Sequence, residues 1–91
     1  MTHTARSFRV TGHVQGVAFR AWTKGQALHL DLAGWVRNEA DGSVTGHAEG
    51  ARDAVEKLID ALHGGPGAAN VRDVRHEPVE PQDLKGFEIR R

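Results

Sequence analysis

Residues 10–20 read VTGHVQGVAFR, and this stretch takes the chain from a strand, through a loop, into a helix. Apolar and polar residues alternate over 8–13, which is the period of a half-buried strand. Residues 13–18 contain glycine and precede a change of spacing, so they predict a loop. From Phe19 onward, apolar residues recur at three- to five-residue intervals, which is typical of a helix. The stretch therefore predicts a loop that sits at the N-terminus of a helix.

The remaining chain repeats this alternation of strands and helices. Residues 34–38 and 43–49 predict two strands joined by a turn at 39–42, because an Asp-Gly pair adopts the positive φ angles of tight turns. A second helix, ended by the Gly-Gly-Pro-Gly run at 64–67, is predicted from apolar residues at i, i+3, i+4 and i+7: Val55, Leu58, Ile59 and Leu62.

The C-terminal part predicts two more strands. Residues 71–79 form the longer one, and we expect it to be irregular because Val71 and Val74 would face opposite sides of a regular strand. Phe87 and Ile89 indicate a short final strand.

This order, β-α-β-β-α-β plus a terminal strand, predicts an α+β ferredoxin-like two-layer sandwich. The expected sheet is antiparallel with strand order 4-1-3-2, and both helices cover one face. In that arrangement the first two strands run parallel on either side of the third. Their C-terminal ends, near His13 and Asn38, then lie at the same edge of the sheet, about 10 Å apart.

Bulk composition narrows the class of protein. A length of 91 residues predicts a single domain over residues 1–91. Twelve Lys and Arg balance twelve Asp and Glu, whereas nucleic-acid binders usually carry a basic excess. Apolar runs are too short for a membrane span, and Met1 to Ser7 is polar with no signal-peptide core. Together with the absence of cysteine, these features predict a cytoplasmic monomer that binds neither nucleic acid nor membrane.

Two stretches carry the candidate chemistry. In the first, amide groups from Gln15 to Arg20 surround a helix N-terminus, which favours an anion, and Arg20 adds a planar fork for two phosphate oxygens. The second, 34–50, opens GWVRN and places Asn38 beside a hairpin turn. Each stretch taken by itself has an ordinary structural explanation. Residues 15–20 fit a glycine-containing turn with an exposed arginine, and Asn38 fits the preference of asparagine for turns.

Together the two stretches resemble the signatures of the acylphosphatase family. Residues 10–20 match Val-x-Gly-x-Val-Gln-Gly-Val-x-Phe-Arg, and 34–50 match Gly-aromatic-Val-basic-Asn-x-x-x-Gly-x-Val with a glycine six residues on. The resemblance extends over nearly the whole chain. It implies an enzyme that hydrolyses the carboxyl–phosphate bond of small acyl phosphates, by water attack at phosphorus, to a carboxylate and inorganic phosphate.

The resemblance also implies roles for particular residues, and it implies no cofactor. Arg20 and Asn38 are the expected catalytic residues, with Asn38 orienting the attacking water. The expected phosphate-binding residues are Gln15, Gly16, Val17, Ala18, Phe19 and Arg20. Two positions depart from the family's usual pattern: Asp31 stands where a glycine is common, and the chain ends in Arg90-Arg91. For Asp31 we expect a left-handed backbone with a small effect on stability.

Metal binding and covalent catalysis are not expected. The histidines are scattered singly over different elements, without ligand-type spacing, at His3, His13, His29, His47, His63 and His76. Of these, His13 borders the phosphate loop. No cysteine or serine lies in a nucleophile motif. Phe19 and Trp22 are expected in the core, whereas Trp35 suits either the core or a ligand contact.

Two other functions share the predicted fold. RNA-recognition domains need stacking aromatic residues on the central strands, and residues 43–49 contain none, while the first strand offers only Phe8. The stronger alternative is a non-catalytic accessory module that binds phosphate or carbamoyl phosphate, because acylphosphatase-like domains occur within larger enzymes. The sequence leaves the acyl group of the substrate open.

Overall fold

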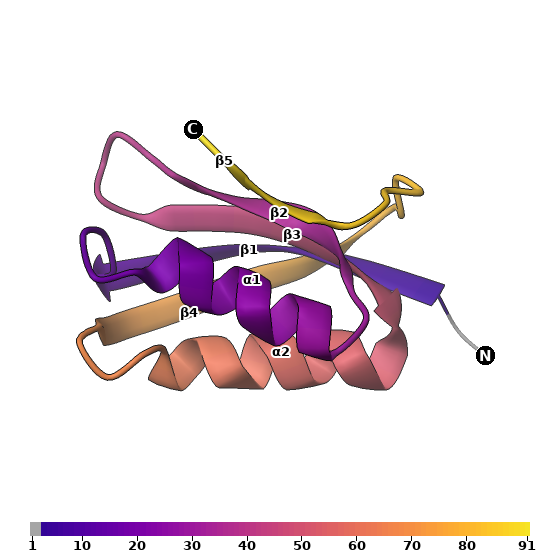
Figure 1. Ribbon diagram of the computed structural model, residues 1–91, viewed down its shortest axis with the longest axis horizontal. Helices are drawn as coiled ribbons and strands as arrows, with labels where there is room; N and C mark the ends of the chain where they lie inside the picture. The colour runs from indigo at the N-terminus through magenta and orange to yellow at the C-terminus, as the bar shows by residue number, and fades with distance from the viewer. Residues whose placement is uncertain (1–2) are drawn as a thin grey trace.

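Figure 1 shows a computed structural model of the chain, which describes residues 3–91 as one sheet with two helices packed on one face. The strands are β1 (His3–His13), β2 (Ala33–Asn38), β3 (Val44–Ala51), β4 (Asn70–Val79) and β5 (Phe87–Arg90), and the helices are α1 (Phe19–His29) and α2 (Arg52–Gly64). Met1 and Thr2, part of the N-terminus expected to lack a signal peptide, lie outside the described residues. Within residues 3–91, neither helix is long and apolar enough to cross a membrane.

The sheet has the order β4-β1-β3-β2-β5, which confirms the 4-1-3-2 arrangement of a ferredoxin-like sandwich. β1 pairs antiparallel with β3 and β4, and β2 pairs antiparallel with β3. The one difference from the expected antiparallel sheet is β5, which runs parallel to β2 and makes the sheet mixed. The reason is the loop over residues 80–86, which reaches the far edge where β2 begins, so that β5 starts beside Gly34 and follows β2.

A β-bulge accounts for the irregularity expected in the fourth strand. Thr11 pairs with Asp73 but Gly12 pairs with Val71, so Arg72 is an extra residue in β4. The extra residue changes the alternation of side chains. As a result, Val74 is buried and Val71 also packs against the core.

The core lies between the sheet and the helices. The four apolar residues predicted to form a stripe on α2 are all buried. Phe19 is buried in the core, as expected, and Trp22 is partly buried and packs against the core, with the two rings 5.4 Å apart. Past the end of α1, Asp31 has φ 57°, which confirms the left-handed conformation expected there.

The second signature stretch begins with a glycine that the sheet requires. Gly34 has φ +149°, and a Cβ atom there would lie 1.8 Å from the backbone oxygen of His47 on β3. We expect Gly34→Ala to lower the free energy of unfolding by about 3 kcal/mol, because either β2 or β3 must shift. Urea denaturation measures the change.

A glycine in α1 provides the control. Gly25 has nothing within 4 Å of where its Cβ would lie, so Gly25→Ala should stabilise the protein by about 0.5–1 kcal/mol through helix propensity. Wild-type stability for Gly34→Ala would contradict the close approach of β2 to β3.

Candidate active site

The loop between β1 and α1 has a backbone shaped to bind an anion. Gly16 (φ 75°) and Ala18 (φ 61°) are left-handed, whereas Val17 between them is not. Such alternation turns successive backbone N–H groups toward one side and forms a concave nest. A left-handed alanine costs about 1 kcal/mol, so the tertiary structure holds this conformation against a local preference. Ala18 is also the N-cap of α1 and supplies no side-chain cap to the first N–H groups of the helix.

A cavity of about 190 Å³ opens beside this loop, where the two signature stretches meet. The loop, the first turn of α1, the end of β2 and the strand β5 all contribute to its wall. The lining residues are Val14, Gly16, Ala18, Phe19, Arg20, Ala21, Asn38 and Ile89. The structure therefore brings Arg20 and Asn38 together, along with three of the expected loop residues, whereas Gln15 and Val17 do not line the cavity.

Asn38 is the last residue of β2, and its side-chain oxygen, Oδ1, is a buried hydrogen-bond acceptor without a partner among residues 3–91. Leaving such an acceptor unpaired costs about 1–3 kcal/mol, and buried polar atoms of this kind are usually satisfied by water or a ligand. An unpaired acceptor in the wall of a cavity is suited to receive a hydrogen bond from a water molecule.

Arg20 lines the same cavity, and its guanidinium is hydrogen-bonded to the backbone of β5. Nη1 donates to the backbone oxygen of Arg90 on β5 at 3.3 Å. No ion pair joins Arg20 to a carboxylate within the described part of the chain, in contrast to Arg9, which pairs with Asp41. The guanidinium has five N–H donors and a permanent charge, so Arg20 presents an uncompensated cation to the cavity.

The side chain of Gln15 connects the loop to the hairpin that follows Asn38. Its Nε2 donates to the backbone oxygens of Glu39 at 2.8 Å and Ser43 at 2.9 Å. The loop and the β2–β3 turn are thereby held at a set separation. Only the backbone of Gln15 was predicted from the sequence to act at the site. This side-chain contact was not predicted, because no local pattern marks partners 24 and 28 residues away.

Other residues considered from the sequence lie away from the cavity. The ring of Trp35 is half-buried, with the guanidinium carbons of Arg37 and Arg90 at 5.2 and 4.7 Å from its centroid. It therefore packs against arginine, neither in the core cluster nor in the cavity. His13 is exposed at the end of β1 and does not line the cavity. Ile89, which the sequence analysis did not consider for the site, does line it.

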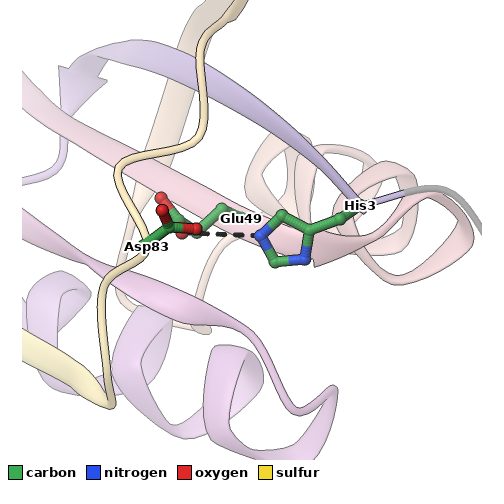
Figure 2. Close-up of side chains that lie close together, drawn as sticks. All are labelled: His3, Glu49 and Asp83. Atoms are coloured by element: carbon green, nitrogen blue, oxygen red, sulfur yellow. Dashed lines mark ion pairs between the residues drawn. The ribbon is translucent and has the colours of Figure 1, made fainter.

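A second group of ionisable residues surrounds Glu49, as Figure 2 shows. His3 and Asp83 lie beside the Glu49 carboxylate, and the potential metal-ligand atoms of the three residues lie within 4.8 Å of one another. The sequence does not indicate this group, because its members are far apart in the chain. The carboxylate already accepts hydrogen bonds from the backbone N–H groups of Gln82 (2.8 Å) and Leu84 (3.1 Å) and from His47 Nε2 (2.7 Å). These bonds make Glu49, which is 1% exposed, the anchor of the 80–86 loop on the sheet.

The hydrogen bonds of the Glu49 carboxylate make the stability of the protein depend on pH. Burial raises the pKa of Glu49, but the hydrogen bonds from Gln82, His47 and Leu84 outweigh it and lower the pKa from 4.5 to about 2. Because the folded-state pKa is the lower one, the stabilisation is complete above pH 4.5 and is lost as the pH falls toward 2. It amounts to about 3 kcal/mol.

Urea denaturation between pH 7 and pH 3 tests this expectation. Glu49→Gln should be less stable at pH 7 by about 3 kcal/mol and should lose less stability on acidification than the wild type. The exposed Glu80, in the same loop, gives the matched control Glu80→Gln, which should follow the wild-type curve. If the stability of both variants changes with pH in the same way, Glu49 does not anchor the loop.

Comparison with known proteins identifies close relatives. The family model described as Acylphosphatase matches residues 6–89. The chain is 51% identical over 86 residues to an acylphosphatase of Salinibacter ruber, covering 93% of this chain and 90% of that protein. It is 54% identical over 82 residues to an acylphosphatase of Trichormus variabilis, covering 90% and 81%.

Solved structures agree with this relationship. An acylphosphatase from Coxiella burnetii superposes with a TM-score of 0.94 at 38% identity, covering 97% of this chain and 93% of that one. A structure of full-length HypF in a phosphate- and nucleotide-bound form also matches, with a TM-score of 0.90 at 28% identity. In that case the match covers 97% of this chain but 12% of HypF.

Proposed function

Because the chain belongs to the acylphosphatase family, we propose that it hydrolyses small acyl phosphates in the cavity lined by Arg20 and Asn38. The observation that carries this proposal is that an unpaired cation and an unpaired hydrogen-bond acceptor line the same cavity. Arg20 presents a positive charge without a carboxylate partner, and Asn38 Oδ1 presents a buried acceptor without a donor among residues 3–91. A phosphate and a water molecule together satisfy both.

The phosphate end of the substrate is held by charge and by backbone. The guanidinium of Arg20 donates to two phosphate oxygens. Backbone N–H groups surround the remaining ones: those of Gly16, Ala18 and Phe19 in the cavity wall, joined by those of Gln15 and Val17 from the adjoining loop. Positive φ angles at Gly16 and Ala18 support this arrangement. As charge builds on the equatorial oxygens in the transition state, these fixed donors stabilise it without having to reorganise.

The water molecule is positioned by Asn38. Oδ1 accepts one hydrogen bond from the water, whose oxygen attacks phosphorus in line with the bond to the acyl oxygen. The new phosphorus–oxygen bond forms as the old one breaks, and the bonding electrons leave with the carboxylate. Asn38 is a neutral amide and a poor base, so the proton of the water passes to a phosphate oxygen. A carboxylate is a good leaving group, and positioning with charge neutralisation supplies most of the acceleration.

An assay of the purified chain tests the function. We expect hydrolysis of benzoyl phosphate that persists with a chelator present, together with competitive inhibition by inorganic phosphate. One alternative is a non-catalytic module that binds phosphate or carbamoyl phosphate. The match to 12% of the length of HypF, a larger protein solved in a phosphate- and nucleotide-bound form, supports an accessory role of this kind. A protein that binds inorganic phosphate but turns over no acyl phosphate would favour that alternative.

We further propose that residues 1–91 act as a single monomeric domain in the cytoplasm, without nucleic-acid or membrane partners. Balanced charge and the absence of cysteine support this proposal. Size-exclusion chromatography with light scattering tests the monomer, and a mass of about twice 9.9 kDa would contradict it.

A further inference from the structure

Apart from Arg20 and Asn38, the accessible wall of the catalytic cavity is formed almost entirely by small residues. Val14 and Phe19 line it but are buried, so an acyl group entering from solvent does not reach much of their surface. The exposed lining residues are Gly16, Ala18, Ala21 and Ile89. Among these four, Ile89 is the only one with a large side chain.

Ile89 is unusual in its exposure. It is 40% exposed, and only Leu28, at 49%, stands with it as an exposed large hydrophobic residue within residues 3–91. Ile89 lies on β5 opposite Val36 of the neighbouring β2, and Val36 comes two residues before Asn38 in that strand. The register therefore holds its side chain beside the reaction centre.

The polar groups of the cavity are already assigned under the proposed function. Arg20 binds the phosphate and Asn38 binds the water, and the other lining side chains are apolar or absent. A polar or charged acyl group would lose hydration here without gaining a hydrogen bond. An apolar acyl group gains contact with an aliphatic surface and gives up little favourable hydration.

We propose that Ile89 binds the acyl group of the substrate, and that the enzyme therefore favours acyl phosphates whose acyl group is apolar and bulky, such as aromatic or branched ones. This inference rests on the proposed function of the same cavity. The contact lies on the part of the substrate that does not react, so it is equal in the ground state and the transition state. It consequently acts on KM and leaves kcat unchanged.

Steady-state kinetics with two substrates tests the role of Ile89. Benzoyl phosphate carries a bulky apolar acyl group, and acetyl phosphate carries a single methyl group. Ile89→Thr keeps the β-branched shape that suits a strand while replacing an apolar branch with a hydroxyl. We expect it to raise KM for benzoyl phosphate about five- to tenfold, with KM for acetyl phosphate and both kcat values within about twofold of wild type.

Two further variants separate this effect from a disturbance of β5. Leu28→Thr changes the other exposed large hydrophobic residue, which does not line the cavity, and should leave both substrates unaffected. Ile89→Phe enlarges the apolar surface and should lower KM for benzoyl phosphate relative to acetyl phosphate. Ile89 variants that change both substrates equally, or neither, would overturn the proposal. Failure of the proposed function itself would show differently, as a wild-type protein that hydrolyses neither substrate.

Discussion

Arg20→Gln is expected to lower kcat/KM for benzoyl phosphate by about a thousandfold or more and to abolish measurable binding of inorganic phosphate. Glutamine retains an N–H donor for the backbone oxygen of Arg90 but loses the charge and the fork. Arg20 has no carboxylate partner among the described residues, so no protein carboxylate neutralises its charge beside the cavity. Removing it takes away both ground-state attraction and transition-state neutralisation, and kcat and KM should worsen together.

Steady-state kinetics and phosphate titration measure this result. Arg9→Gln is the matched control, because Arg9 is exposed, pairs with Asp41 and does not line the cavity. We expect it to keep wild-type activity. Arg20→Lys should fall between wild type and Arg20→Gln, since lysine keeps the charge but cannot donate to two oxygens in a plane. Retention of phosphate affinity in Arg20→Gln would place the phosphate elsewhere.

Asn38→Ala is expected to separate catalysis from binding. Without Oδ1 the water has no fixed acceptor, and kcat should fall about a hundred- to a thousandfold. KM and the inhibition constant of inorganic phosphate should stay within about threefold, because the groups proposed to hold phosphate remain. The substitution also removes a buried acceptor that has no partner within residues 3–91, so thermal stability should be unchanged or slightly higher.

The combination of lower turnover with undiminished stability is what distinguishes a water-positioning role from a structural one. Asn70→Ala, at an exposed asparagine on β4, should leave turnover and stability as in wild type. If Asn38→Ala instead lost stability and phosphate binding along with turnover, Asn38 would be a structural residue of the hairpin. A loss of phosphate binding with kcat unchanged would assign it to phosphate.

Local sequence determined the elements of this protein. The stripe at Val55, Leu58, Ile59 and Leu62 predicted α2, and the alternation before residue 13 predicted β1, because side-chain periodicity follows directly from backbone geometry. The order of the elements then predicted the strand order, since crossovers are right-handed and both helices cover the same apolar face. Even the bulge in β4 was indicated by Val71 and Val74.

Sequence also supplied the candidate catalytic residues, but by resemblance to a family. Spacing alone left Arg20 and Asn38 with ordinary structural explanations. Their meeting at one cavity follows from the sheet, which puts the ends of β1 and β2 at the same edge.

Tertiary structure alone decided the contacts between distant segments. The parallel course of β5, the hydrogen bonds from Gln15 to the hairpin, the Glu49 anchor and the place of Ile89 in the cavity left no local pattern. Contacts of this kind join residues that are far apart in the chain. Gln15 and Glu39 are 24 residues apart, and Arg20 and Arg90, which also meet at the cavity, are 70 residues apart. Periodicity reports which side of an element is buried, whereas the neighbour that buries it depends on how the whole chain closes around its core.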